Sequence, residues 1–479
     1  MKLKDNLSYK VFFLSFIFFS LITHSHVFLA GNDASRFAHM ESLVDRGVSE
    51  IDQSRYRWTR DKITIGNHDY SNKPPLLGGI GAAIYWVLKQ SFGISFIENE
   101  ELVVYFLTLI IVGGATSFLV AQFYVALGLY PEIKPEIRKL VTFALLTGTI
   151  LTSFSATFNN HTIAAALIFP SFYYALLGRA VLSGLFIGLA FCIDIVPGLV
   201  FLPVVVLIIY DLKNIKGIKE LFIPIVAFVG LFISANYFTV GHFLPPKFVS
   251  GGHDYSSAFS SNLFGVLLPE SYLYPIKCLF GSHGFFTVSP ILIFGVAGIL
   301  KAYRHEKIFS KRWIGSLISA CVIFILGHIF FVGSFGGWSY GFRYLIPIIP
   351  IILFFSPVVL EKKNIKIFKG VLAISILITF IGVYNPWPPG FEQDKGGTEI
   401  DSLVTNPIAG NATAFMVEHL PSLSLTKKMV QTFINPDKSK SNQFLMYYFY
   451  SKGDKEMTLK FMKIQGREAE NTIKREEKN

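Results

Sequence analysis

The residue types best suited to chemistry begin just after the first apolar run of the chain, in the order Gly31-Asn32-Asp33-Ala34-Ser35-Arg36. A carboxylate such as Asp33, held at the edge of a membrane, can accept a proton from a hydroxyl group that arrives from water, which is the role of a general base. The same residue could instead cap the helical stretch expected over 34–47, since Asp is favoured at a helix N-cap. Both roles stay open, and they do not exclude each other.

A second motif, Tyr70-Ser71-Asn72-Lys73-Pro74-Pro75-Leu76, opens the apolar stretch 74–92. Because proline is favoured in the first turn of a helix, the motif predicts that a helix begins directly after Lys73. A lysine beside a helix N-terminus could bind a lipid phosphate as a point charge. The alternative is a lysine that only anchors the helix by reaching toward the headgroups.

Three more polar positions interrupt apolar sequence. The triplet Asn159-Asn160-His161 could hydrogen-bond a sugar or a phosphate, or could cap a helix. An acidic group near membrane depth, such as Asp194, indicates function by default, although an aspartate shortly before proline is also an ordinary turn signal. Arg343 enters an apolar run, which is costly unless a phosphate, carboxylate or carbonyl group pairs with it.

No pattern in the sequence is typical of a metal site. The three cysteines lie in or near apolar segments without metal-ligand spacing, and the histidines of the loop over 241–289 show none either. We therefore expect no protein-built metal site and no certain cofactor, and the sequence does not indicate a divalent metal.

The composition places these residues in a membrane protein. Of the 479 residues, 52% are hydrophobic and 16% charged, and the mean hydropathy is +0.49. A soluble chain could not bury so much apolar surface. The net charge of +11 sits in short loops between apolar runs, which indicates contact with phospholipid headgroups and not with nucleic acid.

Apolar runs that approach the roughly 20 residues needed to cross a bilayer predict eleven transmembrane helices. They lie near 10–30, 101–128, 141–157, 163–178, 180–193, 198–210, 221–240, 290–303, 313–332, 343–359 and 368–386. With the N-terminus in the cytoplasm, the inner segments hold 19 Lys and Arg, and the short outer segments 158–162, 194–197 and 333–342 hold none. This asymmetry is what the positive-inside rule predicts.

The stretch 74–92 is apolar enough to span, but a crossing there would place the later basic loops outside. We therefore expect a helix that lies at the outer interface or is partly re-entrant. The predicted organisation is a transmembrane domain over 1–386, with a first outer loop over 31–100 and a second over 241–289, followed by an outer C-terminal tail over 387–479. The lack of an internal repeat argues against many transporter folds.

Together these residues resemble the membrane glycosyltransferases of the GT-C fold, especially bacterial relatives of protein O-mannosyltransferases and of the lipid A aminoarabinose transferase. In that family an acidic residue closely follows the first helix, as Asp33 does here. A Lys/His-Pro-Pro-Leu element then opens an interfacial helix, which matches Lys73-Pro74-Pro75-Leu76. The resemblance covers roughly residues 1–360 and implies an all-α GT-C-like bundle.

The chain departs from the family at two places. The segment 94–101 is acidic where a basic residue usually follows, and Asn159-Asn160-His161 stands where an acidic residue is often found. The second departure argues against a metal-assisted mechanism with two carboxylates.

The resemblance implies an inverting transfer of a sugar from a polyprenyl-phosphate donor to a hydroxyl acceptor on the outer face of a bacterial inner membrane. Asp33 would be the catalytic base, and Lys73, Arg343 and Arg36 would bind the donor phosphate. The sugar or the acceptor (a glycolipid, a protein or a glycan) would contact Asn160, His161 and Tyr70. The competing classes are a transporter or flippase of lipid-linked sugars, and a non-catalytic scaffold of the same fold.

Overall fold

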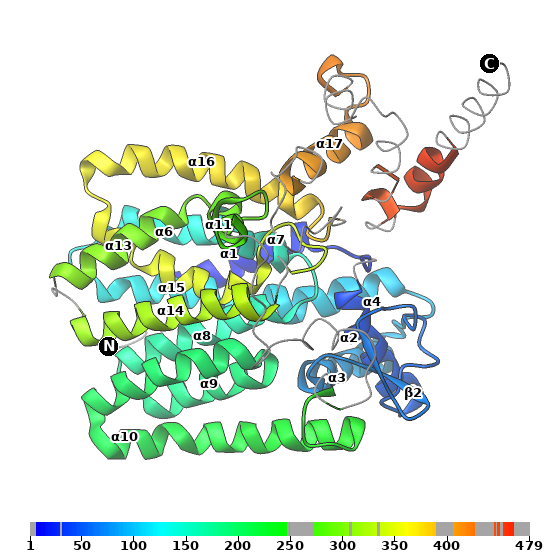
Figure 1. Cartoon of the computed structure of the whole chain (residues 1–479), viewed down its shortest axis with the longest axis horizontal. Coiled ribbons are helices and arrows are strands. Elements are labelled where there is room, and N and C mark those ends of the chain that lie inside the picture. The colour runs from blue at the N-terminus through cyan, green and yellow to red at the C-terminus, as the bar shows by residue number, and fades with distance from the viewer. Residues whose placement is uncertain are drawn as a thin grey trace.

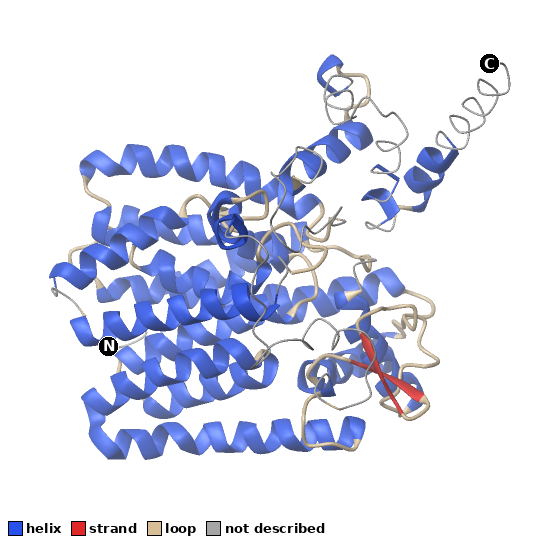
Figure 2. Ribbon diagram, viewed as in Figure 1, coloured by secondary structure: helices blue, strands red, loops and turns tan. Residues whose placement is uncertain are grey.

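The computed structural model describes most of the chain. The described residues are 6–28, 31–246, 249, 273–305, 309–332, 336–388, 406–426, 445–446, 448–450 and 454–463. Most of the second predicted outer loop and much of the C-terminal tail therefore lie outside the described residues. Within them the chain is a helix bundle with one small β-hairpin (Figure 2).

Figure 1 shows how the helices are arranged along the chain. In the first half of the chain they are α1 (Asn6–Ile22), α2 (Asn32–Glu41), η1 (Ser42–Arg46), α3 (Pro75–Phe92), α4 (Glu100–Leu107), η2 (Thr108–Gly113), α5 (Gly114–Ala126), η3 (Leu127–Leu129), α6 (Pro135–Thr147), α7 (Ile150–Ser155), α8 (Asn160–Leu176), α9 (Ala180–Ile193) and α10 (Ile195–Val240). In the second half they are α11 (Leu273–Phe280), α12 (Phe285–Val288), α13 (Leu292–His305), α14 (Lys311–Val332), η7 (Arg343–Ile348), α15 (Ile349–Phe354), η8 (Ser356–Val359), α16 (Lys362–Tyr384) and α17 (Pro407–His419).

Several of these helices are long and apolar enough to cross a bilayer. They are Glu100–Leu129, Ile195–Val240, Lys311–Phe330 and Lys363–Tyr384, and the pair Leu273–Val288 and Leu292–His305, bent by 100°, would make a fifth. The chain is thus an all-helical protein of the multi-pass membrane type. Each of the predicted apolar runs contains helix, but α1 ends at Ile22, eight residues earlier than predicted. The polar residues after it turn there, where the backbone N–H of His24 donates to Ala156 O (2.9 Å).

The 46 residues of α10 are two helices that run in opposite directions, as the separate runs 198–210 and 221–240 predict. Asn214 interrupts the helix with φ 54°. Before it, Gly198 lies against Phe191 near the end of α9. After it, Gly184 of α9 lies against Leu221 and Gly188 against Ile225, so the second helix runs parallel to α9. The order of these contacts shows that the chain reverses at Asn214. Small residues at such contacts are typical of helix packing in membranes.

α3 is not among the helices that are long and apolar enough to cross a bilayer. One of its faces packs closely on α2, since a Cβ at Gly78 would collide with His39 and one at Gly81 with Met40. At its far end, Lys89 pairs with Asp45 of η1 at 2.8 Å. The stretch 74–92 is thus the predicted helix, and its place at the outer interface stays a prediction.

The β-hairpin precedes α3 and consists of β1 (Lys62–Ile65) and β2 (His68–Ser71). The strands are antiparallel, with Ile65 opposite His68, so the loop has two residues. Gly66, the first of them, has φ 63°, a conformation that glycine adopts without strain and that hairpins with a Gly at this position require. The hairpin delivers Lys73 to the start of α3.

The two ends of the bundle differ. The ends of α1 and α16 meet where His24 Nε2 bonds Val383 O at 2.7 Å, so α2 and α17 begin from the same end. In Figure 1 α2, α3, β2 and α17 all lie at the right-hand end of the bundle. At the other end Arg312 pairs with Asp211 (2.9 Å) and Lys301 with Glu361 (2.8 Å). We call these the loop end and the basic end.

Candidate functional site

The loop end contains a connected group of charged and polar side chains, which we call the polar centre. It consists of Asp33, Arg36, Asp61, Lys73, Asn160, His161, Asp194 and Arg343. They come from α2, from the hairpin and the turn before α3, from the start of α8, from the junction of α9 and α10, and from the start of η7. Segments up to 300 positions apart in the sequence therefore meet here.

Asp33 lies in the first turn of α2 and is 2% exposed. Its Oδ1 accepts from the Ala34 N–H (2.9 Å) and its Oδ2 from the Phe28 N–H (3.2 Å). The expectation that Asp33 caps the helix is wrong, because α2 already begins at Asn32, after Gly31 has turned the chain with φ 82°. Burial raises the pKa of Asp33 to about 7, against the opposing effect of the two N–H groups.

Arg36 lies one turn further along α2 and is 3% exposed. Its Nη1 donates to Asn32 Oδ1 (2.6 Å) and its Nη2 to Asn160 Oδ1 (2.6 Å). Burial lowers the Arg36 pKa to about 10, and the nearby Asp61 carboxylate opposes that change. The guanidinium thus joins the first outer loop to the start of α8.

Lys73 forms an ion pair with Asp61, with 2.7 Å between Nζ and Oδ2. Both side chains are more than four-fifths buried. Burial lowers the pKa of Lys73 to about 8, although Asp61 favours its charged form. Burial alone would raise the pKa of Asp61, but Lys73, with Arg343 and Arg36, brings it below its ordinary value. The lysine is therefore part of a buried pair and not an anchor at the membrane surface.

The triplet at the start of α8 divides its roles. Asn159 is the N-cap, because its side chain accepts from the Thr162 N–H at 3.0 Å. Asn160 Oδ1 accepts a hydrogen bond from Arg36 Nη2, and His161 Nδ1 lies 2.7 Å from Asp194 Oδ2. A carboxylate at this distance fixes the orientation of an imidazole ring. The capping interpretation is thus confirmed for Asn159 alone.

Arg343 begins η7 and is 6% exposed. Its guanidinium lies over two aromatic rings, with Cζ 4.7 Å from the Trp387 centroid and 5.1 Å from the Tyr344 centroid. Its Nε and Nη1 are buried and have no hydrogen-bond acceptor among the described residues. Because a buried donor without an acceptor costs about 1–3 kcal/mol, this arrangement points to an anionic ligand.

Tyr70, the remaining predicted site residue, does not join the polar centre. It lies in β2 beside Ser71, and neighbouring residues of a strand point to opposite faces. Ser71 faces α2, where its hydroxyl lies 2.7 Å from Ser35 Oγ. The pKa of Tyr70 is raised by burial and then by Glu50 and Asp52, which lie outside the polar centre.

Two residues that contact the predicted cations, Asp61 and Trp387, were not singled out in the sequence. Asp61 is one of seven acidic residues in 31–73, and no local signal distinguishes it. Trp387 follows α16 in a proline-rich segment that predicts only the entry to the tail. A search for partners of the buried Lys73 and Arg343 would have been needed to find them.

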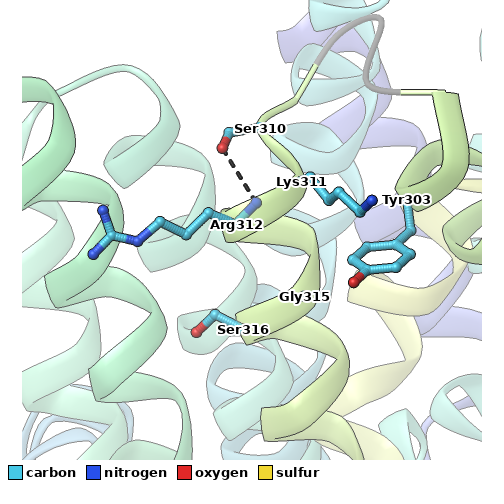
Figure 3. A pocket seen from close by; sticks show the side chains of 6 residues that line it. All are labelled: Tyr303, Ser310, Lys311, Arg312, Gly315 and Ser316. Atoms are coloured by element: carbon cyan, nitrogen blue, oxygen red, sulfur yellow. Dashed lines mark hydrogen bonds between the residues drawn. The ribbon is translucent and has the colours of Figure 1, made fainter.

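No group of three or more His, Cys, Asp or Glu among the described residues is placed to hold a metal ion. A pocket lies at the basic end, lined by Tyr303, Ser310, Lys311, Arg312, Gly315 and Ser316 (Figure 3). None of the predicted site residues lines it. The polar centre thus remains the place where buried charge converges. No protein-family model and no curated protein matches this chain.

Proposed function

We propose that this chain is a glycosyltransferase that moves a sugar from a polyprenyl-phosphate donor to a hydroxyl acceptor at the loop end. The observation that supports this most is Arg343, a buried guanidinium with two N–H groups that lack acceptors. A phosphate oxyanion is the ligand for which such a guanidinium is best suited. We further propose that the bundle crosses the membrane eleven times, as the apolar runs of the sequence predict, with the loop end on the outer face.

The cations of the polar centre would act on the leaving group. When the bond between the anomeric carbon and the phosphate oxygen breaks, the electron pair stays on the lipid phosphate. Arg343 would donate hydrogen bonds to that phosphate, and Lys73 and Arg36 would add positive charge nearby. Donors placed in advance where negative charge develops are among the largest contributions to catalysis.

Asp33 would act on the acceptor. The acceptor hydroxyl attacks the anomeric carbon from the face opposite the phosphate, and its proton passes to the Asp33 carboxylate. A base with a pKa of about 7 is well matched to this task near neutral pH. Two backbone N–H groups hold its oxygens in place, so little reorganisation is needed at the moment of reaction.

Asn160 and His161 would contact the sugar or the acceptor. Asn160 is held by Arg36 and His161 by Asp194, so both side chains are fixed before a ligand binds. The bilayer contributes as well, because the lipid tail of the donor confines it to the membrane edge and so raises its local concentration.

The test is sugar release from labelled polyprenyl-phosphate sugars by purified protein in detergent, with a membrane extract as the acceptor source. Wild type is compared with Asp33→Ala, Lys73→Ala and Arg343→Ala. Turnover in the wild type that collapses in the variants supports the proposal. Donor binding without turnover in the wild type would instead favour a transporter, a flippase or a non-catalytic scaffold.

A further inference from the structure

The segment that follows α16 contacts the polar centre through Trp387 and Arg343. Trp387 is 1% exposed, and its ring lies 4.7 Å from the Arg343 Cζ and 5.0 Å from the Phe154 ring. The backbone N–H of Trp387 donates to Asn385 Oδ1 at 2.9 Å. Just before it, the Pro386 carbonyl accepts from the Tyr340 N–H at 3.0 Å. The turn after α16 is therefore fixed on both sides of Trp387.

A residue of α17 holds this turn from the tail. Asn411 is fully buried, and its Nδ2 donates to the carbonyls of Ile381 and Asn385, both at 2.8 Å. The last carbonyls of a helix have no partner within the helix, so a side chain from elsewhere can satisfy them. Asn411 thus acts as a C-terminal cap for α16 and ties α17 to it.

Aromatic contacts strengthen the attachment of α17. The Tyr384 hydroxyl donates to Glu418, and the Tyr384 ring meets Phe415 edge-on at 5.5 Å. Tyr448, from a later segment, stacks on Tyr384 at 6.5 Å. The last turn of α16 is consequently held by two separate pieces of the tail.

The way in which Trp387 contacts Arg343 matters for binding. An aromatic ring attracts the face of a guanidinium and leaves the N–H groups at its edge free to donate. A carboxylate in the same place would occupy those N–H groups. Trp387 and Tyr344 therefore hold the side chain without using the Nε and Nη1 donors.

We propose that α17 is a clamp that holds Trp387 against Arg343 and so keeps the guanidinium aimed at its anion. Asn411 and Trp387 are positioning residues, since neither would touch the reacting atoms. The identity of the anion as a donor phosphate rests on the proposed function. The clamp itself is a property of the free protein and is measured without any ligand.

The experiment measures how far acrylamide quenches the fluorescence of Trp387 in the full chain in detergent. The Trp387 signal of each protein is its fluorescence minus that of the same protein with Trp387→Phe. The variants are Asn411→Leu, which removes both hydrogen bonds of the cap, and Tyr384→Phe, which removes the single hydrogen bond to Glu418. Asn364→Leu is the matched control, because Asn364 also donates to a helical carbonyl, Val359 O at 2.9 Å, but at the opposite end of α16. The affinity for farnesyl phosphate is then measured, with farnesol as the control that lacks the phosphate.

Trp387 should be protected in the wild type and in Asn364→Leu, open to acrylamide in Asn411→Leu and intermediate in Tyr384→Phe. Farnesyl phosphate should bind about tenfold more weakly to Asn411→Leu, as expected for the loss of a buried cation–π contact. Protection of Trp387 in both Asn411→Leu and Tyr384→Phe overturns the clamp. An exposed Trp387 with unchanged affinity overturns its link to Arg343. Absence of farnesyl phosphate binding in the wild type contradicts the proposed function, while the quenching result still decides the clamp.

Discussion

At the loop end Arg36 and Arg343 are 3% and 6% exposed and Lys73 is mostly buried, whereas at the basic end the side chains of Arg312 and Lys301 are 64% and 39% exposed. Both ends contain ion pairs of similar length, 2.7 Å for Lys73 with Asp61 and 2.9 Å for Arg312 with Asp211. Distance therefore does not distinguish the two kinds of pair. Burial does, because removing a charge from water costs several kcal/mol and exposed pairs contribute about 0–1 kcal/mol.

Burial, and not the length of the ion pairs, is therefore the property that differs between the two ends. Exposed basic residues at one end are solvated by water and need no specific partner. Buried cations at the other end must be compensated by carboxylates, by aromatic rings or by a ligand. Arg343 has two buried N–H groups without an acceptor among the described residues, and Arg46 has one. Four measurements test the difference between the loop end and the basic end.

The largest effect is expected from Asp33→Asn. The variant keeps the size of the side chain but removes the group that accepts the proton, so kcat/KM should fall about 10²–10⁴-fold. Sugar transfer by the purified protein measures it, and donor binding serves as the control that should be retained. Transfer at the wild-type rate would show that Asp33 is only a structural residue.

The same carboxylate and Lys73 together predict a pH dependence. Lys73, whose pKa burial lowers to about 8, loses its positive charge above that pH, so kcat/KM should fall there. Burial raises the pKa of Asp33 to about 7, and only the deprotonated form accepts a proton, so kcat/KM should rise with pH up to about 7. Below that value kcat/KM should fall about tenfold per pH unit. A pH profile of wild type beside Asp33→Glu checks this, and a flat profile across the acid range would contradict it.

Arg343→Lys should lower kcat/KM about 10²-fold, because lysine keeps the charge but not the two parallel donors of the guanidinium. The affinity for farnesyl phosphate should fall with it. A matched control is Arg312→Lys at the basic end, which should leave both quantities unchanged. Equal effects of the two substitutions would remove the distinction between the two ends.

Asp61→Asn should destabilise the protein by about 3 kcal/mol, since it leaves Lys73 buried without its partner. Asp61→Asn combined with Lys73→Met should recover much of that loss, while activity stays low. Thermal unfolding in detergent measures both variants. At the basic end Asp211→Asn should cost less than about 1 kcal/mol, and a larger cost there would show that exposure is a poor guide in this molecule.

The sequence predicted the fold better than the site. Helices follow from apolar runs and from local signals such as Pro74-Pro75, and each of the predicted runs contains helix. The reversal inside α10 was visible as two apolar runs separated by lysines. These features depend on neighbouring residues, so one sequence is enough to read them.

The site depends on contacts between distant residues. Arg343 stood out because charge in apolar sequence is costly, and Lys73 because it directly precedes a helix that begins with proline. The partner of Lys73 did not, because Asp61 is one acidic residue among many in a polar loop. Tyr70 was misplaced because its direction depends on the pleat of a hairpin that the sequence did not predict. The contact of Trp387 with Arg343 joins two segments that no periodicity relates.

The central claim is that buried cations at the loop end exist to bind the phosphate of a lipid-linked sugar. The most direct measurement is the release of labelled sugar from polyprenyl-phosphate donors by purified wild type, Arg343→Ala and Arg312→Ala. We expect turnover in the wild type, its loss in Arg343→Ala and its retention in Arg312→Ala. Equal turnover in all three proteins, or none in the wild type with an acceptor present, would contradict the claim.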